Sequence, residues 1–219
     1  GGPKKLPPPT SVGGCSAVNE LTARKKDKAT PAPTRDTYKE IWDFINGRHP
    51  RSEREDRLVI PRSFAVSEWA LLFARLFERL GIPVFVDNVR ESDLAEGQPL
   101  FHIDTCAPHV GAVGQFRRLA GEPHGLILAL QIEFLPTGGR SAGRTCTLNQ
   151  GGVGVALNLA RLAHPDTRFH LFNVDLSVLD AEALRVQLQD RLAPVFRRYG
   201  IAPDAKALRT ALTGAIEDH

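Results

Sequence analysis

A strand–helix–strand pattern between residues 57 and 88 constrains the fold more than any other feature of the sequence. The apolar run at residues 58–60 predicts a short buried strand that ends at Pro61, and residues 83–86 predict a second strand. Between them lies a helix that Gly81 ends, with apolar residues at helical spacing: Trp69, Leu72, Phe73, Leu76, Phe77 and Leu80. Two buried strands joined by such a helix form a right-handed βαβ unit, so the sequence predicts a parallel sheet.

The remaining sequence extends this pattern. Further strands are expected at residues 101–104, 125–130 and 169–172. Helices are expected to begin near Pro108, to cover residues 153–162 and 181–199, and to close the chain as far as Ile216. We therefore expect an α/β fold of Rossmann-like topology, with a mostly parallel sheet, helices on both faces and a helical C-terminus.

Composition divides the 219 residues into two parts. Residues 1–36 are rich in Pro, Gly and Lys and are expected to form a flexible tail, which contains Cys15. Residues 37–219 are expected to form a single α/β domain, because 42% of the chain is hydrophobic and its length suffices for one core.

Charge and cysteine content exclude several classes of protein. The net charge of +3 is small and no aromatic residues alternate with the basic clusters, so we expect no nucleic-acid partner. No apolar run reaches the ~20 residues of a transmembrane helix, so we expect no membrane partner. Three cysteines, an odd number, argue against a secreted disulfide framework, and a cytoplasmic protein is expected. The sequence contains no P-loop and no dinucleotide-binding glycine motif.

Cys106 is the first candidate site residue. It precedes Pro108, so its sulfur should lie near a helix N-terminus, where the partial positive charge of the helix favours a thiolate. His109 follows at C-x-x-H spacing, which fits a shared metal ion. His109 is also explained as a surface or capping residue, and Cys106 as a buried thiol.

Cys146 is the second candidate, in a loop with small and polar neighbours that allow backbone to approach a ligand. Gln150 and Arg144 flank it and are candidate cofactor-binding residues, although a helix start capped by Asn149 explains the same pattern. Arg62 and Glu68 border the first strand-to-helix turn and are further candidates for cofactor binding. Since both cysteines follow predicted strands, we expect them to converge at one edge of the sheet.

Four segments in this order resemble one known family: IPRSFAVSEWALLFARLFERLGIPVFVDN, TCAPHVGAVG, EFLPTGGRSAGRTCTLNQGG and ALRTALTGAIEDH. The chain resembles the domain that accompanies the ATP-dependent activases of 2-hydroxyacyl-CoA dehydratases, and is similar to the dehydratase subunits, over roughly residues 13–219. The matching positions are Ile60–Arg62 with Leu80 and Gly81, then Cys106, Pro108 and Gly114, then Cys146 and Gln150.

The resemblance implies a Rossmann-like fold and an iron–sulfur function. In the dehydratase subunits three cysteines ligate a [4Fe–4S] cluster that passes an electron to an acyl-CoA, so Cys106 and Cys146 are the implied ligands here. An ATP-dependent activase domain or subunit is the implied partner, and an acyl-CoA is a possible substrate. Relatives place a third cysteine where this chain has Pro136 and Thr137.

Three interpretations of function remain open from the sequence. The first is iron–sulfur-dependent electron transfer linked to acyl-CoA dehydration or reduction, with Cys15 or His109 completing the cluster site. The second is a cluster-free binding or scaffold module of a larger activase-related protein. The third is a structural zinc site formed by Cys106, His109 and Cys146.

Overall fold

A computed structural model describes residues 56–64, 66–102, 104–136 and 143–219, without the side chains of Ser67 and Glu68. All described elements belong to one compact unit, Thr37–His219. The tail expected at residues 1–36 lies outside the described residues, as do Cys15 and Thr137.

The sheet has four parallel strands, which are four of the five strands expected from the sequence. Strands β1 (Leu58–Arg62), β2 (Val84–Asn88), β3 (Leu126–Leu135) and β5 (Phe169–Asp175) lie in the order β2-β1-β3-β5. The short strand β4 (Gly143–Arg144) pairs antiparallel with the end of β3. The first described strand, β1, lies inside the sheet, and later strands extend the sheet on both sides of it, which is the order of doubly wound folds.

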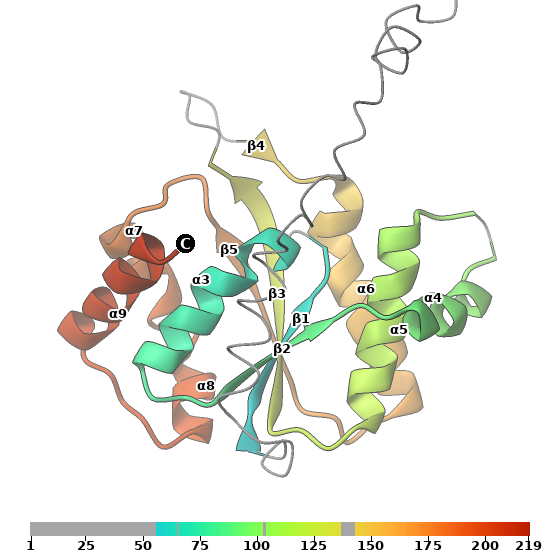
Figure 1. Ribbon diagram of the computed structural model, residues 1–219, viewed down its shortest axis with the longest axis horizontal. Coiled ribbons are helices and arrows are strands. Elements are labelled where there is room, and N and C mark those ends of the chain that lie inside the picture. Colours follow the sequence, from blue (N-terminus) through green and yellow to red (C-terminus); the bar gives the residue numbers. More distant parts are fainter. Residues whose placement is uncertain (1–55, 65, 103, 137–142) are drawn as a thin grey trace, which may run out of the picture. The chain divides into compact units, whose positions relative to one another are not determined.

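Helices cover both faces of the sheet, which confirms the predicted α/β architecture (Figure 1). Each layer has its own hydrophobic core against the sheet. The first layer contains α3 (Val66–Arg79) together with the C-terminal helices α7 (Ala181–Leu188), α8 (Ala193–Arg198) and α9 (Ala205–Glu217). The second contains α5 (Ala107–Gly121) and α6 (Thr147–Ala163), and the short α4 (Glu91–Gly97) and the 3-10 turn η2 (Gln98–Leu100) pack against α5.

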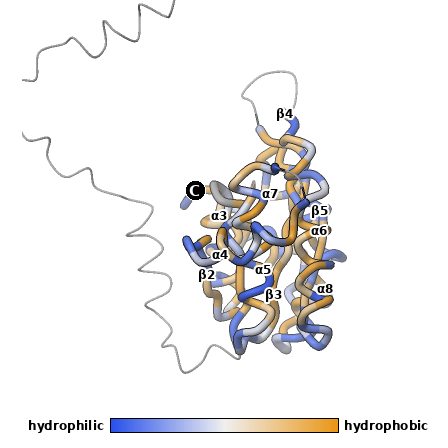
Figure 2. The backbone as a smooth tube through the Cα atoms, turned by 90° about the vertical axis from the view of Figure 1, so that its right-hand side faces the viewer, coloured by the Kyte–Doolittle hydropathy of each residue, from blue (hydrophilic) through white to orange (hydrophobic). Residues whose placement is uncertain are grey.

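Helix α3 buries the apolar stripe expected from its sequence. Leu72, Phe73, Leu76 and Phe77 are each at most 1% exposed. Trp69 is half-buried, and the centroid of its ring lies 4.5 Å from that of His219. Gly81 ends the helix in the left-handed conformation (φ +76°) that glycine adopts without strain. The hydropathy colouring of the backbone in Figure 2 shows the alternation of apolar and polar segments that such layers require.

The prediction that β1 ends at Pro61 is wrong, because the strand continues through Pro61 to Arg62. The backbone N–H of Leu58 donates to Pro83 on β2, so the alternating residues Val59 and Pro61 face β3. Pairing between β1 and β3 is restricted to Leu58 and Val59. At Pro61 the hydrogen bonds between β1 and β3 have already ended, so the missing N–H of this proline costs no hydrogen bond of the sheet.

Two further expectations are corrected. Residues 101, 102 and 104 form no strand; the connection from β2 to α5 contains α4 and η2 instead. The single helix expected over residues 181–199 is divided into α7 and α8. The division lies next to Pro194, which has no N–H to donate to an i−4 carbonyl and disfavours helical backbone at the residue before it.

Candidate functional site

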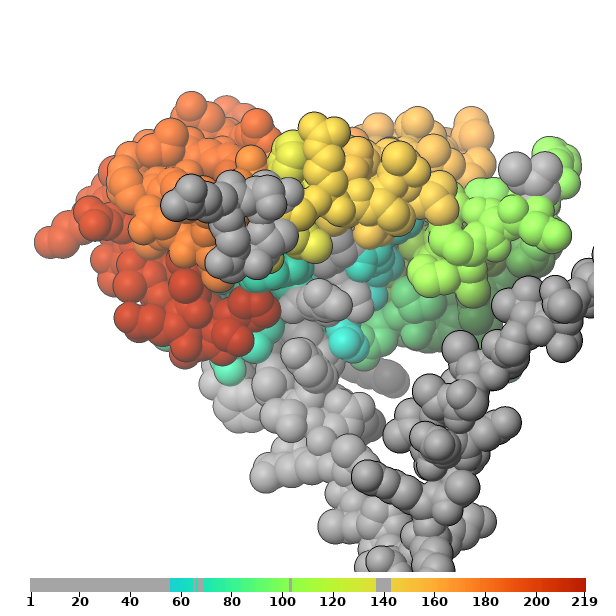
Figure 3. Space-filling model, turned by 90° about the horizontal axis from the view of Figure 1, so that it is seen from above, coloured from blue at the N-terminus to red at the C-terminus, as the bar shows by residue number. Residues whose placement is uncertain are grey.

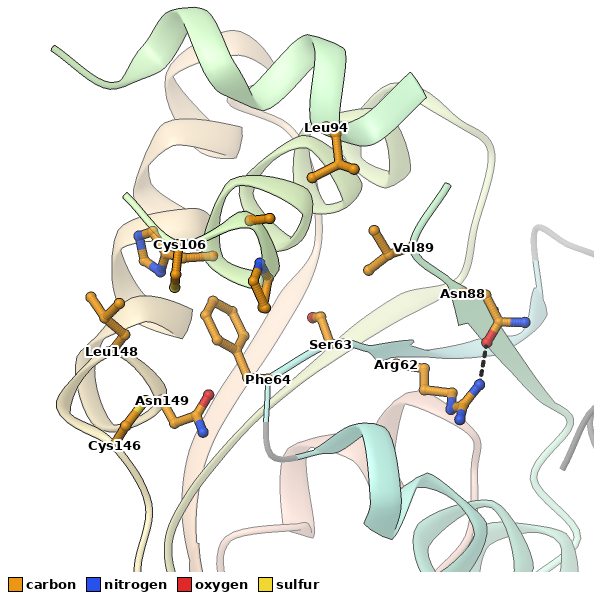
Figure 4. Close-up of a pocket in the computed structure, with 13 residues that line it drawn as sticks. Arg62, Ser63, Phe64, Asn88, Val89, Leu94, Cys106, Cys146, Leu148 and Asn149 are labelled. Atoms are coloured by element: carbon orange, nitrogen blue, oxygen red, sulfur yellow. Dashed lines mark hydrogen bonds between the residues drawn. The ribbon is translucent and has the colours of Figure 1, made fainter. Parts of the chain in front are cut away.

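A pocket lies at the carboxyl edge of the parallel strands. Helix α3 follows β1 on one face of the sheet and α6 follows β3 on the other, so the connections diverge between these adjacent strands. The cavity has a volume of about 710 Å³. Its lining comes from the ends of β1 and β2, from α4 and from the starts of α5 and α6: Arg62, Ser63, Phe64, Asn88, Val89, Leu94, Cys106, Ala107, Pro108, His109, Cys146, Leu148 and Asn149 (Figure 4).

Cys106 and Cys146 lie on the wall of this one pocket, at the starts of two neighbouring helices. Each residue occupies the N-cap position, Cys106 of α5 and Cys146 of α6, and neither helix start has a side-chain cap. Both thiols are free and exposed, contrary to the interpretation of Cys106 as a buried thiol. Asn149 is not the cap, because α6 begins at Thr147. Figure 3 looks onto this edge, with the yellow start of α6 beside the green residues of α5.

His109 lies beside the thiols but is buried, with 4% of its surface exposed. Its ring makes edge contacts with Phe64 and Phe101, at centroid separations of 5.6 and 5.1 Å. Nδ1 has no hydrogen-bond partner among the described residues, and a Cβ added to Gly152 of α6 would lie 2.8 Å from it. Burial lowers the pKa of His109. The structure therefore shows a buried imidazole packed between α5 and α6, where burial favours its neutral form, rather than the surface or capping residue considered from the sequence.

Arg62 also lines the pocket, on the side where β1 and β2 end (Figure 4). Its Nη1 donates a hydrogen bond to Oδ1 of Asn88, at 3.2 Å. Glu68 lies in the first turns of α3, and its side chain is outside the described part of the structure.

Gln150 and Arg144 do not line the pocket. The Nε2 of Gln150 donates to the backbone oxygen of Thr145 at 2.6 Å, so this side chain braces the loop before α6. The guanidinium of Arg144 lies 5.0 Å from the ring centroid of Phe134 and 3.9 Å from a carboxylate oxygen of Glu133. In these positions both side chains contact neighbouring residues of the chain and lie outside the lining of the pocket.

Sequence reasoning missed the apolar residues of the pocket. Phe64 stands in the loop after β1 with φ +55°, a conformation that is strained for a bulky residue. Val89, Leu94 and Leu148 are 37%, 38% and 38% exposed and form an apolar rim at its mouth. No sequence pattern distinguishes these residues from ordinary core positions, because only the arrangement of four separate segments brings them together.

A buried ionic network joins α4, which forms one wall of the pocket, to α5 and to the end of β2. Arg118 of α5 donates to Asp87 at the end of β2 (2.6 Å) and to Asp93 of α4 (2.7 Å), and the two aspartates are 2% and 0% exposed. Gln115 donates to Asp87 as well, at 2.9 Å. Burial alone would lower the pKa of Arg118, but its hydrogen bonds to Asp93 and Asp87 outweigh this effect and raise the pKa above its usual value.

The pocket offers the type of ligand atom that a soft metal prefers, but the described residues supply too few of these ligands. Thiolate sulfur is the ligand that iron–sulfur clusters and zinc prefer, and two cysteines border the cavity. Within the described residues, no group of three or more His, Cys, Asp and Glu side chains is arranged to hold a metal ion. A complete site therefore needs ligands beyond Cys106 and Cys146.

None of the helices in the described part of the chain is both long and apolar enough to span a bilayer. Comparison of the chain with known protein families, with curated proteins and with solved structures finds no match.

Proposed function

We propose that the pocket at the carboxyl edge of the sheet holds a [4Fe–4S] cluster, and that the protein takes part in low-potential electron transfer in the cytoplasm. The observation that carries this proposal is the position of Cys106 and Cys146. They come from connections 40 residues apart (146 − 106), yet both stand free and exposed on one cavity. Two free, exposed thiols at the edge where α/β folds place their ligands support a binding site rather than packing.

The local structure suits an anionic, thiolate-bound group. The N-termini of α5 and α6 both meet the cavity, and the partial positive charge of a helix N-terminus stabilises negative charge. When bound, such a cluster supplies one-electron chemistry. The residues of this chain would hold it through the two thiolates and shield it from water with the apolar side chains of Phe64, Val89 and Leu94.

The resemblance described above extends this proposal to substrates and partners. An electron delivered at this edge would serve acyl-CoA dehydration or reduction, with an ATP-dependent activase domain or subunit as the electron donor. Cys15 is the remaining cysteine of the chain and is the first candidate for a further ligand.

The test is anaerobic reconstitution of the full chain with iron and sulfide. We expect about four irons and four sulfides per cluster and a broad visible absorption. Cys106→Ser and Cys146→Ser should each abolish most of this absorption, whereas the matched control His124→Asn, on the opposite edge of the sheet, should retain it. A chain that binds no iron, or two variants that bind as much as the parent, would exclude the proposal.

A second function is favoured by the apolar rim of Val89, Leu94 and Leu148. These exposed side chains at the mouth of a large cavity suit a cluster-free module that binds an organic ligand or the apolar surface of a partner. A third possibility is a zinc site at Cys106, His109 and Cys146, which all line the pocket. Metal analysis of the purified chain separates the three functions, since they predict iron with sulfide, no metal, and one zinc.

A further inference from the structure

Two buried polar side chains of the pocket, Ser63 and His109, keep hydrogen-bonding capacity that no described residue uses. Ser63 is 5% exposed and His109 is 4% exposed, so both are more than nine-tenths buried. Neither the hydroxyl of Ser63 nor Nε2 of His109 has a hydrogen-bond partner among the described residues, and both atoms retain some accessible surface. Because both residues line the pocket, this surface faces the cavity (Figure 4).

The position of the His109 ring decides which of its nitrogens carries the proton. Nδ1 is fully buried beside Gly152, and no described group accepts a hydrogen bond from it. Burial lowers the pKa of His109 and so favours the neutral imidazole, which has one N–H. A buried N–H without an acceptor is costly, so the proton belongs on Nε2, from which it can be donated into the cavity.

Backbone donors of two helices meet the same cavity. An α-helix leaves its first N–H groups unpaired, and neither α5 nor α6 has a side-chain cap. At the start of α6 these are the N–H groups of Thr147 and Leu148. In α5 only that of Ala107 remains, because Pro108 has no N–H and the N–H of His109 is already paired within the first turn, at 2.9 Å. Both N-termini favour negative charge in the cavity, and α6 contributes more donors.

Phe64 brings these donors together. Its ring, next to Ser63 in the chain, lies 5.6 Å from that of His109, and a Cβ added to Gly152 of α6 would lie 2.8 Å from atoms of both rings. Gly152 comes about one helical turn after Leu148. The loop after β1, the first turn of α5 and the first turns of α6 therefore present their donors to one region of the pocket.

The charge and shape of the lining restrict the ligand. Arg62 is the only Arg, Lys, Asp or Glu among the thirteen described residues that line the pocket, and its Nη1 donates to Asn88 at 3.2 Å. These described residues include no glycine, so the lining lacks the Gly-rich backbone that wraps phosphate groups. Apolar contact comes from Phe64, Val89 and Leu94, and a cavity of about 710 Å³ has the size of sites for small organic ligands.

We propose that this pocket binds the carboxylate of a small organic acid that has an apolar body. The carboxylate accepts hydrogen bonds from Nε2 of His109, from the hydroxyl of Ser63 and from the first N–H groups of α6, and the apolar body lies against Phe64, Val89 and Leu94. A single negative charge matches a site of mostly neutral donors. This inference rests on the proposed function in taking the pocket as the ligand site, but it does not need the cluster.

The test is calorimetric titration of the full, reduced, metal-free chain with decanoate. We expect one site with a Kd on the order of 100 μM, and binding of the uncharged analogue decanamide at least about tenfold weaker. Ser63→Ala and His109→Leu should each weaken decanoate binding about tenfold or more, because each removes a hydrogen bond to a charged group. Ser177→Ala is the matched control, since Ser177 follows β5 at the same edge of the sheet but does not line the pocket, and it should bind decanoate as the parent does.

Alkylation of the thiols locates the ligand without relying on the folding of these variants. Decanoate should slow the reaction of iodoacetamide with Cys106 and Cys146, which are exposed and line the pocket, relative to Cys15 of the same chain. Binding that leaves both rates unchanged would overturn the proposal.

The titrations can overturn the proposal in three further ways. These are no binding of decanoate up to about 5 mM, decanamide that binds as tightly as decanoate, and folded Ser63→Ala and His109→Leu chains that bind like the parent. Decyl phosphate that binds more tightly than decanoate would overturn it in favour of a phosphate site. Iron reconstitution is a separate measurement: a chain that binds decanoate and no iron excludes the cluster alone, and a chain that binds iron and no decanoate excludes the carboxylate site alone.

Discussion

Replacement of Gly114 by Ala tests the contact between α4 and α5 that shapes one wall of the pocket. A Cβ added to Gly114 would lie 1.8 Å from the backbone oxygen of Asp93 and 2.6 Å from its carbonyl carbon. Both atoms belong to backbone, so relief requires a shift of α4 itself by roughly 1.5 Å, since non-bonded carbon and oxygen atoms approach no closer than ~3.2–3.4 Å. Asp93 would move with it, away from Arg118.

The magnitude follows from three contributions. Overpacking of a well-packed interior costs about 1–3 kcal/mol. The shift also weakens the hydrogen bonds between Arg118 and buried Asp93, whose complete loss would cost about 3–5 kcal/mol. Against these, Ala is better than Gly inside a helix by about 1 kcal/mol. We expect Gly114→Ala to lower the free energy of unfolding by about 2–4 kcal/mol.

Gly154 of α6 is the matched control for this substitution. A Cβ added there meets no atom within 4 Å, so only the gain in helix propensity applies. Gly154→Ala should therefore raise the free energy of unfolding by about 0.5–1 kcal/mol. Urea unfolding of both variants at one protein concentration measures the two effects, which have opposite signs. A Gly114→Ala chain as stable as the parent would show that α4 does not pack on α5 as described.

Three further perturbations test the core and the site. Phe73→Ala should destabilise the chain by about 3–5 kcal/mol in denaturant unfolding, as for other buried Phe deletions, and a change below about 1 kcal/mol would show that the stripe of α3 is not buried. Arg118→Met should cost about 3–5 kcal/mol, since the buried carboxylates of Asp87 and Asp93 lose the guanidinium that pairs with both, and an unchanged midpoint would contradict the ionic network. The pKa of His109 is lower in the folded than in the unfolded state. As the pH falls, the unfolded chain therefore takes up this proton at a higher pH than the folded chain, and the free energy of unfolding should decrease as the pH drops through about 6.5. His109→Asn should make this fall shallower, and an identical pH profile would disprove the assignment.

The sequence alone determined the architecture of this domain. Apolar runs with a period of two or with no period marked the four parallel strands, and the helical spacing of Leu72, Phe73, Leu76 and Phe77 marked the helix that covers them. The helix cap at Asp180 could also be predicted from the sequence. Its carboxylate accepts hydrogen bonds from the backbone N–H groups of Glu182 and Ala183. These features depend on residues close together in the chain.

Tertiary structure alone decided the composition of the site. Cys106 and Cys146 were visible as candidates, but Phe64, Leu94 and Leu148 join them only because strand order and helix packing bring distant segments to one edge. The same packing turned Gln150 and Arg144 away from the pocket, to partners on neighbouring loops and strands. A sequence pattern records which face of its own element a residue occupies, whereas contacts between elements depend on the whole set of packing interactions. For this reason the fold could be predicted here, and the walls of its pocket could not.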